Sequence, residues 1–292
     1  MSHNILIVGC GSIGLRLAMS LKAQHQVYGL KRNAEGLPAE INGISADVTL
    51  PSTLRGRLPN QLDYVVYCLT ASEFNDETYQ EIYVKGLTNL INELALSNLS
   101  PKRLFFVSSS SVYSQDNDQW VNEETPVSPT RFSGQRLLEA EAVALSCKFP
   151  ASNIRFSGIY GGSRTRLLKQ VKSGAANSNS PAYTNRVHED DCVLILKHLI
   201  KKDSKGGTLE DCYLASDSEP VPMSKLVAWI ADQVKCSASS KEKSKAINAK
   251  KRSAGSKRCS NKRLLDSGYQ FKYPSFKEGY EDMIKEIKGP LT

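Results

Sequence analysis

Four consecutive serines occupy positions 108–111, directly after the apolar run "LFFV" at 104–107. A buried strand that ends in hydroxyl side chains can present them to a ligand, whereas the same serines in an exposed linker would do no chemistry. Ligands of open α/β sheets bind outside the carboxyl ends of the strands. This position therefore favours the rim of an active site, with Ser109 and Ser110 as candidates for contact with a substrate.

A glycine-rich stretch near the N-terminus could hold a phosphate. Gly9, Gly11 and Gly14 have G-x-G-x-x-G spacing between a predicted strand and a predicted helix. The first glycine permits a tight turn, the second lets the backbone approach a pyrophosphate, and the third allows close helix–strand packing. The N–H groups at the start of the helix, at Ser12 and Ile13, favour an anion. The stretch predicts a dinucleotide site.

The residues after the second predicted strand bear on which dinucleotide binds. An acidic residue there would bind the ribose 2′-hydroxyl of NAD, but this sequence has Lys31 and Arg32. Two cations favour the 2′-phosphate of NADP over NAD, although a Lys-Arg pair is also typical of an exposed turn. Asp47 and Val48 follow the third predicted strand, where by fold analogy an adenine ring is contacted.

The net charge of +8 comes from one segment, residues 241–263, which has ten Lys or Arg residues and one Glu. The rest of the chain is close to neutral. The segment is interpreted as a solvated loop or helix face, as a site for the phosphates of a small ligand, or as a nucleic-acid patch, in decreasing order of preference.

Composition excludes several other classes of protein. No stretch approaches 18 uninterrupted apolar residues, so we expect no transmembrane helix. A strand-like run begins within four residues of Met1, which leaves no room for a signal peptide and favours the cytoplasm. The seven cysteines have no C-x-x-C pair, and the four histidines have no ligand spacing, so we expect no metal.

The first 160 residues alternate short apolar runs with longer amphipathic ones. Strands are predicted near 4–9, 26–30, 64–71, 104–110 and 153–161, and helices at 12–24, 79–98 and 134–148. Strands that are apolar almost throughout are typical of a parallel sheet buried on both faces. The predicted fold class is therefore α/β, a Rossmann-like doubly wound parallel sheet.

The second half of the sequence has a different pattern of apolar and polar residues. A polar loop at 173–185 precedes predicted helices at 189–202, 223–234 and 275–288 and a strand at 212–216. We expect residues 1–160 to form an NAD(P)-binding Rossmann domain and residues 161–292 to form mainly a small C-terminal α/β substrate lobe, with some elements returning to the sheet.

The order of the motifs resembles the extended short-chain dehydrogenase/reductases. "YCLTA", "SSSSVY", "IRFSGIYGGSR" and "NRVHEDD" follow the glycine loop in the family's order, and the C-terminal "CSNKRLLDSGYQFKYPSFKEGY" is similar to YeeZ-type epimerase/dehydratase proteins. The resemblance implies a nucleotide-sugar-like substrate and a possible homodimer through the helices near 79–94 and 134–145. It also implies that Leu69, Thr70 and Ala71 contact the cofactor and that Ser109 orients a substrate hydroxyl or carbonyl.

One family feature is missing. Family members carry Y-x-x-x-K, in which the tyrosine transfers a proton and the lysine holds the nicotinamide ribose; here Phe132 and Arg136 have that spacing. Phenylalanine cannot titrate. Arginine stays protonated, so Arg136 can bind ribose or phosphate but cannot replace the tyrosine. The chain is therefore an atypical member by this resemblance, with its usual acid/base lost.

Three other residues are candidates for proton transfer or substrate contact, each with a structural alternative. Tyr113 is a catalytic candidate or a packing residue, and Tyr160 contacts substrate or shapes the cofactor loop. His188 is an acid/base or substrate contact, or else hydrogen-bonds at a helix start near Asp190 and Asp191. Arg164 is a candidate for a substrate phosphate or an ordinary surface residue.

Three functions follow from these observations. The first is an NAD(P)-dependent oxidoreductase or epimerase/dehydratase-like enzyme, with a nucleotide-sugar-like or small carbonyl or hydroxyl substrate. The second is a non-catalytic NAD(P)-binding sensor or scaffold, which the missing tyrosine favours. The third, a nucleic-acid-associated protein, depends only on residues 241–263 and is the least favoured.

Overall fold

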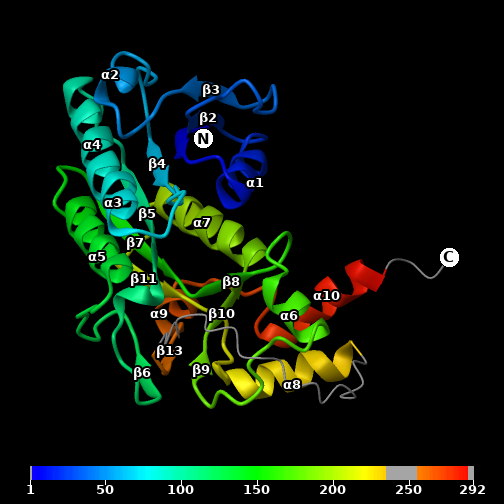
Figure 1. The fold of residues 1–292 in the computed structure, drawn as a ribbon. Coiled ribbons are helices and arrows are strands. Elements are labelled where there is room, and N and C mark those ends of the chain that lie inside the picture. The colour runs from blue at the N-terminus through cyan, green and yellow to red at the C-terminus, as the bar shows by residue number, and fades with distance from the viewer. Residues whose placement is uncertain (1, 235–254, 289–292) are drawn as a thin grey trace.

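The computed structural model describes residues 2–234 and 255–288, and its centre is a seven-stranded sheet (Figure 1). All neighbouring strands are parallel, in the order β11-β7-β5-β4-β1-β2-β3. The strands are β1 (Asn4–Val8), β2 (Gln26–Lys31), β3 (Asn42–Ser45), β4 (Tyr64–Tyr67), β5 (Arg103–Ser109), β7 (Ala151–Phe156) and β11 (Cys212–Ala215). The chain order reverses between β1 and β4, so the sheet is doubly wound and the predicted fold class is confirmed.

Helices cover both faces of the sheet because its strands are apolar on both sides. Ile5 and Ile7 of β1 pack with α1 (Ser12–Leu21) and α7 (Glu189–Ser204). Leu6 and Val8 face the opposite way, toward the core that includes α4 (Gly86–Leu96) and α5 (Phe132–Leu145). In Figure 1, α4 and α5 accordingly lie across the sheet from α1 and α7. A short helix α2 (Pro51–Leu54) follows β3, and α3 (Asp76–Tyr79) continues through a π-helical segment (Gln80–Lys85) into α4.

A second, smaller core lies beyond the carboxyl edge of the sheet. It is formed by α6 (Arg166–Lys172), α8 (Met223–Gln233) and α10 (Phe276–Lys288), which bury Leu168, Leu226 and Tyr280. Three strand pairs connect it to the sheet: β8 (Gly158–Tyr160) with β10 (Arg186–His188), β9 (Tyr183–Thr184) with β12 (Val221–Pro222), and β6 (Gln119–Val121) with β13 (Lys257–Cys259). Helix α9 (Lys262–Asp266) follows β13.

One predicted strand is divided into two strands in the structure. The apolar run at 153–161 was predicted as a single strand, but β7 ends at Phe156 and β8 begins at Gly158. The two strands belong to different sheets because β8 pairs with β10, a partner distant in sequence. None of the helices in the described ranges combines the length and apolarity that crossing a membrane requires.

Strand β7 carries an arginine into the core, and a buried carboxylate on α5 neutralises it. Arg155 Nη2 lies 2.6 Å from Glu141 Oε2, and both side chains are less than a tenth exposed. Glu141 also accepts a 2.5 Å hydrogen bond from the Ser108 hydroxyl, and Arg155 Nη1 donates to the Tyr113 hydroxyl at 2.9 Å. The Tyr113 hydroxyl in turn donates to the carbonyl of Asn122 at 2.8 Å. This buried network anchors the chain on both sides of the serine run.

We predict that Arg155→Met lowers the free energy of unfolding by about 3–5 kcal/mol, because it leaves the Glu141 carboxylate buried without a counter-charge. Urea denaturation of the variant measures the loss. The double variant E141L/R155M is the control, and it should be destabilised less than the single variant. A single variant within about 1 kcal/mol of the wild type would contradict the predicted cost of an unpaired buried charge.

Candidate functional site

The glycine loop joins β1 directly to α1. Gly9 has φ +101°, a left-handed conformation that favours glycine, and its N–H donates to the carbonyl of Leu30 at 3.0 Å. A Cβ on Gly14 would overlap the carbonyl oxygen of Gly9 and would lie 2.8 Å from Cys68 Sγ. Gly14 therefore allows the first turn of α1 to lie against the end of β1.

The start of α1 is open to a ligand. Gly11 is the residue before the helix, no side chain caps it, and the first turn contains no acidic residue. A Cβ placed on Gly11 would meet no atom within 4 Å. Free N–H groups and the positive end of the helix dipole therefore point into open space, as an anion such as a pyrophosphate requires.

The other predicted cofactor residues lie at the same edge of the sheet, because parallel strands end together. Lys31 ends β2, Arg32 follows it as an exposed residue, and neither has an ion pair within the described part of the chain. Asp47 follows β3 and accepts hydrogen bonds from the N–H and hydroxyl of Thr49. Val48 is buried, and its carbonyl accepts from Asn89.

The segment after β4 lies beside the glycine loop. A Cβ on Gly9 would lie 2.9 Å from both the side chain and the amide nitrogen of Leu69. Thr70 is exposed at this edge, and the N–H of Ala71 donates to the Tyr83 hydroxyl at 3.4 Å. These residues border the loop as the resemblance implies, and their contact with a cofactor stays a prediction.

The serine run forms a tight turn at the carboxyl end of β5. Ser109 is the last residue of the strand, and its hydroxyl accepts a 3.2 Å hydrogen bond from the N–H of Ser111. Ser110–Val112 form a 3₁₀ turn. Ser109, Ser110 and Ser111 all line a cavity of about 430 Å³, so they lie at a ligand-sized site rather than in a linker.

The cavity lies between the sheet and the short strands of the small lobe. Its other walls come from the segment after the serine turn, the start of α5, the β7–β8 junction and the residues around β9 and β13. These are Tyr113, Ser114, Asp116, Pro129, Thr130, Arg131, Ser133, Ser157, Gly158, Tyr183, Thr184, Asn185, Gly255 and Lys257. The lining residues are mostly polar and include one acid, Asp116, and two basic residues, Arg131 and Lys257; such a surface suits a hydroxyl-rich ligand.

The position expected for the catalytic tyrosine is apolar. Phe132 packs against Phe74 and Tyr79, with ring centroids 4.9 and 5.4 Å apart. Arg136, four residues on, is engaged by the Asp76 carboxylate through Nε at 2.8 Å and Nη2 at 3.0 Å. The residue pair therefore forms part of the packing between α3 and α5, and the predicted contact of Arg136 with the cofactor gains no support from this position.

Tyr113 has the role of a packing residue. Its hydroxyl is committed to Arg155 and to the Asn122 carbonyl, and burial raises its pKa well above the ordinary value near 10. A phenol that is already hydrogen-bonded and harder to ionise is a poor proton-transfer group at neutral pH. The structure thus favours the packing alternative for Tyr113.

Tyr160, His188 and Arg164 are close to one another but are not among the residues that line the cavity. The Tyr160 ring is stacked on Tyr280, 4.6 Å between centroids, and meets the His188 ring edge-on at 5.1 Å. His188 caps α7 by accepting from the N–H of Asp190 at 3.1 Å, and burial lowers its pKa below the ordinary value. Arg164 forms an ion pair with the buried Glu189.

This cluster shows that the motifs "GIYGGSR" and "NRVHEDD" form one packed unit. A Cβ on Gly161 would overlap the His188 ring, and one on Gly162 would overlap the Glu189 carboxylate. Glu189 also binds Arg16 of α1 at 2.8 Å. The predicted substrate contacts of Tyr160, His188 and Arg164 therefore lack support, and their structural alternatives fit the geometry.

Several cavity residues were not identified from the sequence. Lys257 belongs to the basic segment 241–263, of which residues 241–254 lie outside the described residues. Asn185, in the quoted "NRVHEDD", holds β13 in place: its side-chain amide donates to the Lys257 carbonyl at 3.0 Å and its oxygen accepts from the Cys259 N–H at 2.7 Å. Ser157, at the β7–β8 junction, has a buried hydroxyl without a partner in the described structure. All three residues lie in segments that the sequence singled out, but none was identified there as a residue of this cavity.

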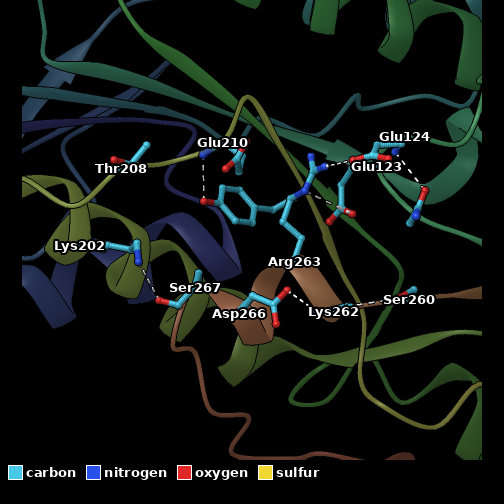
Figure 2. Close-up of a pocket in the computed structure, with 12 residues that line it drawn as sticks. Glu123, Glu124, Lys202, Thr208, Glu210, Ser260, Lys262, Arg263, Asp266 and Ser267 are labelled. Carbon is cyan, nitrogen blue, oxygen red and sulfur yellow. Dashed lines mark hydrogen bonds and ion pairs between the residues drawn. The ribbon is translucent and has the colours of Figure 1, made fainter.

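A second cavity, of about 500 Å³, flanks the edge strand rather than its carboxyl end, where ligands of open α/β sheets bind (Figure 2). Glu123 accepts from the N–H of Leu214 at 2.7 Å, and Arg263 donates to the carbonyl of Cys212 at 3.3 Å, so these side chains cover the free edge of β11. Arg263 also pairs with Glu124 at 3.0 Å, and Lys262 pairs with Asp266 at 2.6 Å. Arg263, Glu124, Lys262 and Asp266 thus already have partners of opposite charge.

Comparison with known proteins gives one consistent result. The model of the NAD dependent epimerase/dehydratase family matches residues 5–202. Protein YeeZ of Escherichia coli is 27% identical over 280 residues, covering 92% of this chain and 96% of YeeZ. A Methylobacillus flagellatus structure, provisionally described as an NAD-dependent epimerase/dehydratase, has 36% identity, a TM-score of 0.84 and coverage of 99% and 100% of the two chains. Thermus thermophilus UDP-glucose 4-epimerase, solved with NAD, has 15% identity, a TM-score of 0.73 and coverage of 99% and 100%.

The doubly wound sheet and the glycine loop at its carboxyl edge define a Rossmann-like protein of the dinucleotide-binding class. The family match extends over more than half of the sequence. The chain belongs to the NAD-dependent epimerase/dehydratase family.

Two glycine substitutions separate folding from ligand binding. Gly11→Ala should leave the unfolding temperature unchanged, because the added methyl meets open space, but should weaken NADPH binding by an order of magnitude or more if the pyrophosphate lies against this residue. Gly14→Ala should lower the unfolding temperature, because its methyl overlaps the backbone of Gly9. Calorimetry and NADPH titration measure the two effects. Full NADPH affinity in Gly11→Ala would contradict the placement of the pyrophosphate.

Proposed function

We propose that the protein is an NAD(P)-dependent oxidoreductase or epimerase-type enzyme that acts on a hydroxyl or carbonyl group of a nucleotide-sugar-like substrate. The observation that carries this proposal is the position of the serine-lined cavity. It lies at the carboxyl edge of β5 and β7, while the glycine loop ends β1 at the same edge and beside the reversal of strand order. A dinucleotide on the loop and a substrate in the cavity would therefore be neighbours.

The residues of the loop fit a dinucleotide. The uncapped start of α1 and the open space at Gly11 would take the pyrophosphate, and the solved relative with NAD supports the cofactor class. Lys31 and Arg32 would meet the 2′-phosphate, which is why we propose NADP over NAD. When bound, the nicotinamide supplies or accepts a hydride. The protein's own contribution is to orient the substrate, and we assign that role to the Ser109 hydroxyl.

The observation that favours a second function is Phe132. The expected phenol is absent, and the ring at its position is packed among aromatic side chains. A protein that bound NADP(H) without turning over a substrate, as a sensor or scaffold, would have no use for that phenol. This second candidate predicts stabilisation by the cofactor and no redox chemistry.

Cofactor preference is tested on Arg32. Arg32→Ala should weaken NADPH binding by roughly 10–100-fold, the loss expected for a charge-assisted hydrogen bond to the 2′-phosphate. NADH has no 2′-phosphate, so its affinity should change little, and it serves as the internal control. Fluorescence titration with both cofactors measures the ratio. Equal losses for NADPH and NADH would refute the assignment of Arg32.

Turnover is tested with UDP-glucose, UDP-N-acetylglucosamine and a panel of small carbonyl compounds, followed by nicotinamide absorbance and product analysis. We expect turnover of at least one compound, and a loss of about 10²-fold or more in Ser109→Ala if the hydroxyl orients the reacting group. Unfolding temperature and NADPH affinity of the variant show that its fold is intact. Cofactor binding with no turnover of any compound would favour the sensor.

A further inference from the structure

Lys257 is a buried lysine that lines the cavity. It is 7% exposed, and among the described residues its Nζ has one hydrogen-bond partner, the carbonyl oxygen of Tyr113 at 3.3 Å. Its position is fixed by the pairing of β13 with β6 and by the Asn185 amide, which holds the Lys257 carbonyl and the Cys259 N–H. The amine thus lies in the same cavity as Ser109.

No carboxylate neutralises Lys257 within the described residues. Asp116 lines the cavity and Asp118 lies beside β13, but the Asp118 carboxylate accepts a hydrogen bond from Ser256 and neither acid is within ion-pair distance of Nζ. The other charged or titratable groups that line the cavity are Tyr113, Arg131 and Tyr183. Arg258 and Cys259 follow Lys257 on β13 and are not among the lining residues. An ammonium group at this position would have three N–H donors, and the described residues offer it one acceptor, the Tyr113 carbonyl.

Burial without a counter-charge disfavours the charged form of a lysine. Burial lowers the pKa of Lys257 below its ordinary value, and the nearby Cys259 opposes this only in part. A neutral amine fits the observed contacts better than an ammonium group does. One N–H donates to the Tyr113 carbonyl, and the nitrogen lone pair remains available to a ligand.

We propose that Lys257 is the proton-transfer residue of this cavity and replaces the tyrosine that the chain lacks at Phe132. This inference rests on the proposed function, because it needs a substrate hydroxyl or carbonyl group in the cavity. Lys257 enters the site from the small lobe rather than from α5, so the proton-transfer group and the Y-x-x-x-K position are separate in this protein.

The proposed step balances in both directions. In oxidation of a CH–OH group, the C–H bond breaks and its hydrogen leaves with two electrons as a hydride, which the oxidised nicotinamide accepts. The O–H bond breaks, and the proton moves to the lone pair of neutral Lys257 Nζ, forming a third N–H bond. In reduction of a carbonyl group, a bound reduced nicotinamide would supply the hydride that forms the new C–H bond, and the ammonium group would return its proton to the alkoxide oxygen.

The alternative is that Lys257 stays charged and anchors an anionic part of the substrate. Lys257→Arg separates the two roles, because arginine keeps the positive charge but does not give up its proton. Lys257→Met removes both the charge and the proton-transfer group while it keeps most of the apolar stem.

The first experiment measures the amine directly in the wild-type protein, without substrate. Trace labelling with 1-fluoro-2,4-dinitrobenzene across pH 6–11, read by peptide mass spectrometry, gives the pH at which each lysine becomes reactive. We expect the midpoint for Lys257 to lie below the average of the other lysines, because its burial disfavours the charged form. A midpoint at or above that average overturns the proposal, whatever the enzyme turns over.

The second experiment compares turnover of UDP-glucose by the wild type, K257R and K257M. If Lys257 transfers the proton, both variants lose about 10²–10⁴-fold in kcat, and the rise of the oxidation rate with pH disappears in K257R. K257R with wild-type kcat and pH profile overturns the proposal and supports the anion anchor. NADPH affinity and unfolding temperature show whether each variant is folded.

The proposed function and the proposed role of Lys257 can fail separately. If the wild type turns over none of the tested compounds, the proposed function fails. The labelling midpoint still decides whether the cavity holds a neutral lysine, because that measurement needs neither cofactor nor substrate.

Discussion

The buried ion pair between Glu141 and Arg155 is the interaction on which the candidate site depends. It joins α5 to β7 and holds Ser108 and Tyr113, the residues on either side of the serine turn. The Tyr113 carbonyl then accepts from Lys257, so the turn and the lysine share one anchor. A buried pair of this kind adds little net stability compared with apolar packing, but it fixes geometry because neither charge can remain buried alone.

The second constraint is steric and lies at the other end of the ligand site. The contact of Gly14 with Gly9 lets α1 begin directly at the end of β1, which leaves its uncapped N–H groups open at the carboxyl edge of the sheet. Parallel strands bring the ends of β1, β2, β4 and β5 to one edge, so the glycine loop, the Lys31–Arg32 pair and the serine turn converge without being near in sequence. The strand order of the sheet thus determines where ligands would lie, and the chemistry depends on a few side chains at the carboxyl ends of its strands.

The sequence predicted the sheet because its strands are apolar almost throughout, and it predicted the helices because their apolar residues have helical spacing. The predicted helix at 223–234 corresponds to Met223–Gln233, and that at 189–202 to Glu189–Ser204. The sequence did not predict the short strand pairs, because strands of two or three residues are too short to show a pattern of apolar residues. In the pair of β6 with β13, the two strands are also more than 130 residues apart in the sequence. Lys257 depends on that pairing. A lysine in a basic run is normally solvated, but Lys257 is buried and has long-range contacts with β6, Tyr113 and Asn185. His188 and Tyr160 were candidates for substrate contact when their motifs were considered separately. In the structure their rings pack against each other.

The central claim is that cofactor and substrate meet at the serine turn although the usual tyrosine is absent. A crystal structure of the wild-type protein with NADPH tests this most directly. The account predicts the pyrophosphate over Gly11, the 2′-phosphate against Arg32, and the nicotinamide ring at the mouth of the cavity that Ser109 and Lys257 line. A nicotinamide ring outside that cavity, with Ser109 and Lys257 beyond reach of any substrate bound beside it, would contradict the account.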